Sequence, residues 1–115
     1  MSVKIYHNPR CSKSRQTLAL LQDKGIEPVI VEYLKNSPNA DEIANILNKM
    51  NAQPRDIMRT REQVYKDLGL ADESISNEQL IKAMVDNPIL IERPIVITDK
   101  GACVCRPPES VKIIL

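Results

Sequence analysis

The chain has 115 residues, room for one domain, and its 43% hydrophobic and 27% charged residues are typical of a globular protein. Its formal net charge is only +1, and it contains neither Trp nor Phe. This composition argues against a nucleic-acid-binding protein, because both a basic surface and an aromatic platform for bases are missing. No apolar run approaches the roughly 20 residues that span a bilayer, and no signal peptide is evident, so we expect a cytoplasmic protein without membrane contacts.

The first third of the chain reads as a strand, a helix and a strand. Residues 3–6 carry β-forming residues, and a helix that starts next to Cys11 has apolar positions at helical spacing until Gly25. Residues 28–33 form the second strand candidate. A βαβ unit of this length has parallel strands, and the loop after its first strand lies at the carboxyl edge of the sheet, where α/β proteins place their sites.

The middle of the chain is predicted to be helical. Asn39 and Ser76 each begin a capping-box pattern ahead of an apolar stripe, and the second of these helices stops before Pro88. Pro54 is suited to open a short helix, and Gly69 is suited to end another.

The last part of the chain returns to strands. Residues 95–98 and 102–105 flank a short turn, and residues 109–114 resemble a closing helix. The sequence therefore predicts an α/β fold with one mixed four-stranded sheet. We expect residues 1–115 to form a single domain that contains a helical insertion at about residues 39–91.

Cys11 is the strongest candidate for a reactive group. A helix N-terminus favours a thiolate, and three cations lie within four residues of Cys11 in the sequence. Ser14 stands where a dithiol oxidoreductase would carry its second cysteine, so this motif cannot form a disulfide of its own. The alternative for Cys11 is a small buried hydrophobic residue, but its polar neighbours disfavour that role.

Three arginines are candidates for binding an anion beside this thiol. Arg93 precedes the third predicted strand, Arg106 follows the fourth, and Arg59 lies in the helical region. Guanidinium groups bind tetrahedral oxyanions in a bidentate manner, so their convergence on a thiolate would bring an oxyanion to a nucleophile. Each of them could instead be an ordinary surface arginine.

His7 and Ser14 are candidates for supporting the thiolate. His7 could lower the pKa of Cys11 as a base or charge partner, and Ser14 could orient the sulfur by a hydrogen bond. A loop histidine that hydrogen-bonds the backbone is an equally good interpretation of His7.

Two further cysteines, Cys103 and Cys105, fall on one face of the last predicted strand. Regular strand geometry would keep their Cβ atoms beyond the roughly 4.5 Å that a disulfide tolerates, so we interpret both chiefly as strand residues. A zinc site formed with His7 and Cys11 is disfavoured by its unusual ligand spacing and by the nearby arginines. A phosphatase loop is disfavoured too, because Thr17 stands where its arginine is required.

Together these motifs resemble those of the glutathione/glutaredoxin-coupled arsenate reductases, over nearly the whole chain. The matching segments are Tyr6-His7-Asn8-Pro9-x-Cys11, Ser14-Arg15-x-Thr17-Leu18, Tyr33-Leu34, Arg59, Tyr65-x-x-Leu68-Gly69-Leu70, Asn87-Pro88-Ile89-Leu90-Ile91-x-Arg93-Pro94-Ile95-Val96 and Cys105-Arg106-Pro107. The resemblance implies a thioredoxin-like fold, with flanking helices, an inserted helical subdomain and a cis proline at Arg93-Pro94.

The resemblance also implies residue roles. Cys11 would be the nucleophile, Arg59, Arg93 and Arg106 would bind the oxyanion, and His7 and Ser14 would support the thiolate. Cys11 would attack arsenate to form an arseno-thioester, and glutathione as co-substrate and glutaredoxin as partner would complete the reduction to arsenite. No bound metal or organic cofactor is implied, and we expect a monomer.

Two other functions occur among relatives with this fold. One is a glutathione-dependent thiol oxidoreductase with another substrate, and the other is a non-enzymatic regulator that binds RNA polymerase. Both stay open at this point, although Ser14 removes the Cys-x-x-Cys redox switch that such regulators often carry.

Overall fold

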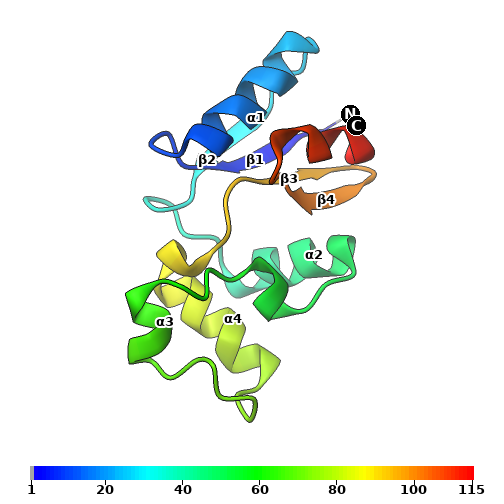
Figure 1. Cartoon of the computed structure of the whole chain (residues 1–115). Coiled ribbons are helices and arrows are strands. Elements are labelled where there is room, and N and C mark those ends of the chain that lie inside the picture. The colour runs from blue at the N-terminus through cyan, green and yellow to red at the C-terminus, as the bar shows by residue number, and fades with distance from the viewer. Residues whose placement is uncertain (1) are drawn as a thin grey trace. The chain divides into compact units, whose positions relative to one another are not determined.

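The computed structural model of the chain describes residues 2–115 and divides it into two compact units (Figure 1). The first unit combines the segment that ends at Asn36 with Arg93–Leu115. The second unit is Ser37–Glu92 and contains the range expected for the helical insertion. The segments before and after Ser37–Glu92 therefore belong to one unit, and the helical insertion lies between them in the sequence.

The first unit is built on a four-stranded mixed sheet in the order β2-β1-β3-β4. Its strands are β1 (Lys4–His7), β2 (Val29–Glu32), β3 (Ile95–Thr98) and β4 (Gly101–Val104). β1 pairs parallel with β2 and antiparallel with β3, and β3 pairs antiparallel with β4. The predicted parallel βαβ unit and the mixed sheet are both confirmed.

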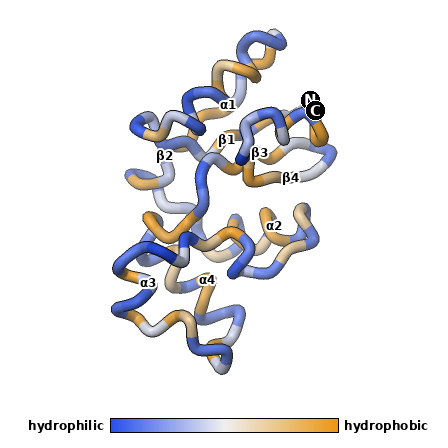
Figure 2. Tube along the Cα trace, in the orientation of Figure 1, coloured by the Kyte–Doolittle hydropathy of each residue, from blue (hydrophilic) through white to orange (hydrophobic). Residues whose placement is uncertain are grey.

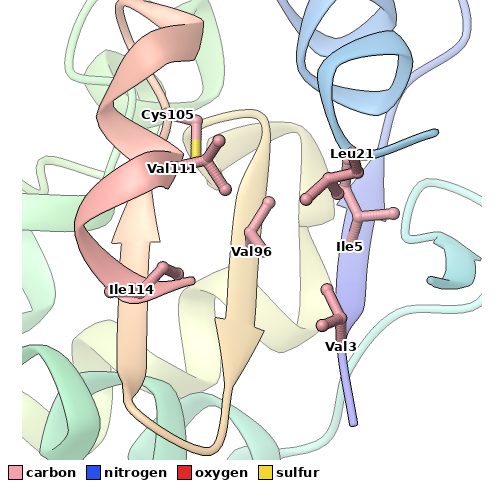
Figure 3. Packing of buried hydrophobic residues seen from close by; sticks show 7 residues of the cluster. All are labelled: Val3, Ile5, Leu21, Val96, Cys105, Val111 and Ile114. Atoms are coloured by element: carbon pink, nitrogen blue, oxygen red, sulfur yellow. The ribbon is translucent and has the colours of Figure 1, made fainter. Parts of the chain in front are cut away.

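One face of this sheet is covered by α1 (Ser12–Asp23) and by the 3-10 helix η3 (Pro108–Ile114). Figure 3 shows the apolar core between them, to which Leu21 of α1 and Val111 of η3 both contribute. Gly25 follows α1 with a φ of 76°, a left-handed conformation that favours glycine and allows the helix to end there. This core fixes the start of α1 relative to the carboxyl end of β1.

The second unit is helical: α2 (Ala40–Met50), η1 (Pro54–Ile57), α3 (Gln63–Asp67), α4 (Asn77–Asp86) and η2 (Pro88–Leu90). Hydrophilic and hydrophobic residues alternate along α2 and α4 in Figure 2, as amphipathic helices require. The predicted capping boxes are present, since Asn39 and Ser76 accept hydrogen bonds from the backbone N–H groups of Glu42 and Gln79. Within residues 2–115, no helix is long and apolar enough to cross a membrane.

Candidate active site

Cys11 occupies the N-cap position of α1, with an extended backbone (φ −92°, ψ 123°). Its N–H donates to the carbonyl of Asn8 at 3.0 Å, which closes a turn between β1 and α1, and its own carbonyl accepts from the N–H of Arg15 at 3.0 Å. The thiol is half-buried. The strand-to-helix turn therefore places the sulfur at the positive end of the helix dipole.

The surroundings of Cys11 lower its thiol pKa from the ordinary value of 9.0. Partial burial opposes this shift, but the backbone N–H of Ser14, the Arg93 side chain and the backbone N–H of Lys13 outweigh it. The Cys11 side chain does not form an N-cap hydrogen bond with α1. These donors therefore stabilise the thiolate more than the neutral thiol, which lowers the pKa.

Arg93 is the arginine whose side chain interacts with Cys11. Its guanidinium acts both as a hydrogen-bond donor and as a positive charge on the thiolate, and it also interacts with Tyr33. The Nε–H of Arg93 is buried and has no hydrogen-bond partner among residues 2–115. A buried donor of this kind is costly to leave unpaired, and it fits an anionic oxygen placed next to the sulfur.

Arg106 lies beside Arg93. Its Nη1 donates to the carbonyl oxygen of Arg93 at 3.3 Å, and its side chain is otherwise exposed. Both residues precede proline, and the Arg93–Pro94 and Arg106–Pro107 peptide bonds are cis. The cis bond at Pro94 agrees with the resemblance, whereas the one at Pro107 was not predicted. Two of the three predicted anion-binding arginines thus lie in the unit that carries Cys11.

Arg59, the third of these arginines, belongs to the second unit. Its Nε lies 3.0 Å from Oε1 of Glu62, and both side chains are about one quarter exposed (22% and 25%). Its backbone N–H donates to the carbonyl of Leu90 at 2.6 Å, next to a short antiparallel bridge between Met58 and Ile91. The segment that carries Arg59 is therefore fixed within the second unit.

Ser14 and His7 hydrogen-bond each other. Ser14 Oγ lies 2.6 Å from Nδ1 of His7 and accepts from the N–H of Asn8 at 3.1 Å, and both Ser14 and His7 are buried. Burial lowers the pKa of His7 below 6.5, Glu32 opposes the shift and Arg15 adds to it. The hydroxyl of Ser14 thus hydrogen-bonds two residues of the segment before Cys11. The backbone N–H of Ser14 lowers the pKa of the Cys11 thiol.

Two residues of this site, Lys13 and Tyr33, were not predicted from the sequence. The backbone N–H of Lys13 acts on Cys11, and Tyr33 interacts with Arg93. A backbone donor leaves no signature in residue type, so only the helix start could indicate Lys13. Tyr33 ends the second predicted strand next to β1, and that position was the available signal.

The prediction that Cys103 and Cys105 are both strand residues is confirmed for Cys103 and wrong for Cys105, which lies just past the end of β4. Their Sγ atoms lie 2.8 Å apart without a bond, and all three cysteines of the chain are free. Because β4 ends at Val104, Cys105 no longer follows the regular alternation of a strand.

A cavity of about 230 Å³ adjoins the Cys11 loop. It is lined by Pro9 and Arg10 from this loop, by Glu32 at the end of β2 and by Leu34 and Lys35 after it, together with His7 and Asn8. Within residues 2–115, no three His, Cys, Asp or Glu side chains gather closely enough to hold a metal ion.

The chain is similar to proteins of one family over nearly its whole length. The family model described as the ArsC family matches residues 6–114. The chain belongs to the ArsC family. An arsenate reductase from Haemophilus influenzae is 48% identical to it over an alignment of 116 positions, which covers all of both chains. A protein from Escherichia coli K12, "Uncharacterized protein YfgD", is 53% identical over 110 residues, which cover 95% of this chain and 92% of that protein.

Solved structures agree with the fold of this ArsC family member. The structure of an arsenate reductase from Vibrio cholerae superimposes with a TM-score of 0.97 at 47% identity, and the match covers 100% of this chain and 98% of that chain. The fold is therefore thioredoxin-like, with the mixed sheet and flanking helices that the sequence predicted.

Proposed function

We propose that this ArsC family member is an arsenate reductase that uses Cys11 as its nucleophile. The observation that carries the proposal is the pairing of Cys11 with Arg93. The thiol pKa of Cys11 is lowered, and the guanidinium beside it has a buried Nε–H without a partner among the described residues. Relatives named arsenate reductase, which match over the full chain, support the choice of oxyanion.

In this proposal, the first step forms a bond between sulfur and arsenic. The Cys11 thiolate attacks arsenic(V), and one arsenate oxygen leaves as water after protonation. Arg93 and Arg106 neutralise the remaining oxygens, and Arg59 is the third proposed anion ligand. Charge-assisted hydrogen bonds from guanidinium groups suit both the substrate and the more crowded transition state.

The second step transfers two electrons to arsenic. The glutathione thiol reacts with the arseno-thioester, arsenic is reduced to arsenite, and Cys11 and glutathione are left as a mixed disulfide. Glutaredoxin then reduces this disulfide by thiol–disulfide exchange and restores the Cys11 thiol. The need for an external thiol follows from Ser14, which stands where a local resolving cysteine would lie.

The cavity beside the Cys11 loop supports glutathione as the co-substrate. Glutathione carries two carboxylates and one ammonium group, and the cavity presents the cations of Arg10 and Lys35 and the carboxylate of Glu32. We expect Lys35→Glu to raise the KM for glutathione and to leave the KM for arsenate unchanged. An equal rise in both constants would contradict this assignment.

A reconstituted assay tests the proposed function. Purified protein is mixed with arsenate, glutathione, glutaredoxin, glutathione reductase and NADPH, and both NADPH oxidation and arsenite are measured. The wild-type chain should produce arsenite, and Cys11→Ser should reduce turnover to background. Reduction of glutathionylated substrates without arsenate turnover would instead indicate a general thiol oxidoreductase. The cytoplasm is the proposed compartment, because its glutathione pool supplies the reductant.

A further inference from the structure

Cys103 and Cys105 form a close pair of thiols that the proposed reaction does not use. Their Sγ atoms lie 2.8 Å apart, inside the van der Waals contact distance of two sulfur atoms but longer than the roughly 2.05 Å of a disulfide bond. Both thiols are free. The pair is therefore already assembled for bond formation while it is reduced.

Two backbone hydrogen bonds hold Cys105 in place just after the end of β4. The N–H of Arg106 donates to the carbonyl of Val104 at 3.0 Å, a tight turn centred on Cys105, and the N–H of Cys105 donates to the carbonyl of Pro94 at 3.0 Å. In a continuing strand, residues two apart would be separated by about 6.6 Å, twice the rise per residue. The two side chains nevertheless converge, since their Sγ atoms lie 2.8 Å apart. The hydrogen bond to Pro94 holds Cys105 against the segment that enters β3.

The two thiols differ in access to solvent. Cys105 is 0% exposed and packs in the core with Val96 and Val111 (Figure 3), whereas Cys103 is half-buried on β4, the last strand in the sheet order. A small reagent can therefore reach Cys103 and not Cys105. This asymmetry assigns Cys103 as the attacking thiol and Cys105 as the resolving thiol.

We infer that Cys103 and Cys105 are a second thiol–disulfide exchange site, which reduces small disulfides such as oxidised glutathione. The Cys103 thiolate attacks one sulfur of the disulfide, the S–S bond breaks, and one glutathione thiolate leaves. Cys105 then loses its proton and attacks Cys103 Sγ, and the second glutathione leaves. The two protein thiols are oxidised to one disulfide, and one oxidised glutathione is reduced to two molecules of glutathione.

Hydrogen bonding within the pair supports this order of events. A hydrogen bond from Cys105 stabilises the Cys103 thiolate and lowers the pKa of Cys103. The same hydrogen bond raises the pKa of Cys105, and burial and the charge on Cys103 raise it further. When Cys103 enters a mixed disulfide it loses its negative charge, so only burial continues to hold the proton on Cys105.

The inference does not depend on Cys11 or on arsenate, and it can be tested in the full-length Cys11→Ser variant. This protein is incubated with oxidised glutathione, alkylated with iodoacetamide in denaturant and analysed by intact mass and peptide mapping. The expected product has lost two hydrogen atoms, and Cys103 and Cys105 are alkylated only after reduction. Two alkylated thiols, or a stable glutathione adduct on either residue, would overturn the inference.

Two further variants in the Cys11→Ser background assign the roles within the pair. Cys105→Ala should stop at the first step and accumulate one glutathione on Cys103. Cys103→Ser should stay unmodified, since Cys105 is buried. Modification of Cys105 in Cys103→Ser would overturn the assigned order. Cooperative thermal unfolding checks that each variant is folded, and the mass of the Cys11→Ser protein alone decides whether the disulfide forms.

Discussion

Arg93 acts on Cys11 both as a hydrogen-bond donor and as a positive charge, across 82 positions of sequence. The cis bond to Pro94 follows Arg93 directly, and β3 begins at Ile95, next to β1 in the sheet. The pairing of β1 with β3 thus brings the start of one strand to the loop that follows the other. The guanidinium that lowers the pKa of the thiol is therefore also the one that we propose as an arsenate ligand.

The first prediction concerns Arg93→Ala. Removal of the guanidinium should raise the pKa of Cys11 towards its ordinary value, because a donor and a positive charge are both lost. Arsenate turnover should fall about 10²-fold or more, the usual effect of removing one charge-stabilising donor. The pH dependence of iodoacetamide alkylation, followed on the Cys11 peptide, measures the pKa directly.

The exposed residue Arg61 supplies the matched control for this experiment. Arg61→Ala removes one arginine from the chain without removing a group that acts on the thiol, so the alkylation profile should match wild type. An unchanged Cys11 profile in Arg93→Ala would contradict the role assigned to Arg93.

The second prediction concerns Arg59→Ala and the binding of arsenate. Arg59 belongs to the second unit, so its proposed role is tested by the binding of arsenate and not by the pKa of Cys11. As a proposed arsenate ligand it should contribute about 1.5–3 kcal/mol to binding, and its loss should raise the KM for arsenate roughly 10- to 150-fold. Steady-state kinetics at varied arsenate measure this effect, and a wild-type KM would exclude Arg59 from the binding site.

Local sequence signals predicted most elements of the fold because each depends on residues close in the chain. The capping boxes at Asn39 and Ser76 fixed where two helices begin, and the alternation in residues 95–98 indicated β3. The end of β4 was harder to predict. The alternating pattern continues through Cys105, yet the hydrogen bond from Arg106 to Val104 turns the backbone after Val104.

The site was less accessible to sequence reasoning than the fold. Cys11 stands at a strand-to-helix junction, which residue patterns can locate. The contact between Arg106 and the Arg93 carbonyl depends instead on the pairing of β3 with β4, and sequence spacing alone contains no such information. The motif resemblance indicated these arginines, and the folded sheet showed how two of them come together.

The third prediction concerns Ser14→Ala. Loss of the hydroxyl leaves Nδ1 of buried His7 and the N–H of Asn8 without their partner, which should cost about 1–3 kcal/mol of the free energy of unfolding. The backbone N–H that acts on Cys11 is retained, so the thiol pKa should stay below its ordinary value. Urea unfolding and Cys11 alkylation measure the two effects on the same sample.

Ser12 is the control for Ser14, because it is an exposed serine in the first turn of the same helix. Ser12→Ala should change stability by no more than about 0.5 kcal/mol. If Ser14→Ala were as stable as Ser12→Ala, the buried hydrogen bonds of Ser14 would not contribute as we expect.

The last prediction is a loss of stability in mild acid that originates from His7, the one histidine of the chain. Burial holds the pKa of His7 in the folded protein below the 6.5 of an ordinary histidine, with Arg15 adding to the shift and Glu32 opposing it. Below about pH 6.5 the unfolded chain therefore binds more protons than the folded chain, and unfolding becomes more favourable. The stability associated with neutral His7 is fully present above pH 6.5 and is lost as the pH falls through the folded pKa.

Urea unfolding at a series of pH values, together with the NMR titration of the single imidazole, measures this dependence. Wild type should lose stability as the pH falls below about 6.5, the ordinary pKa of histidine. His7→Asn should show a flatter profile over this range, because an amide can still accept from Ser14 but does not protonate. Equal slopes for the two proteins, or an imidazole pKa at or above 6.5, would show that burial of His7 does not control acid stability.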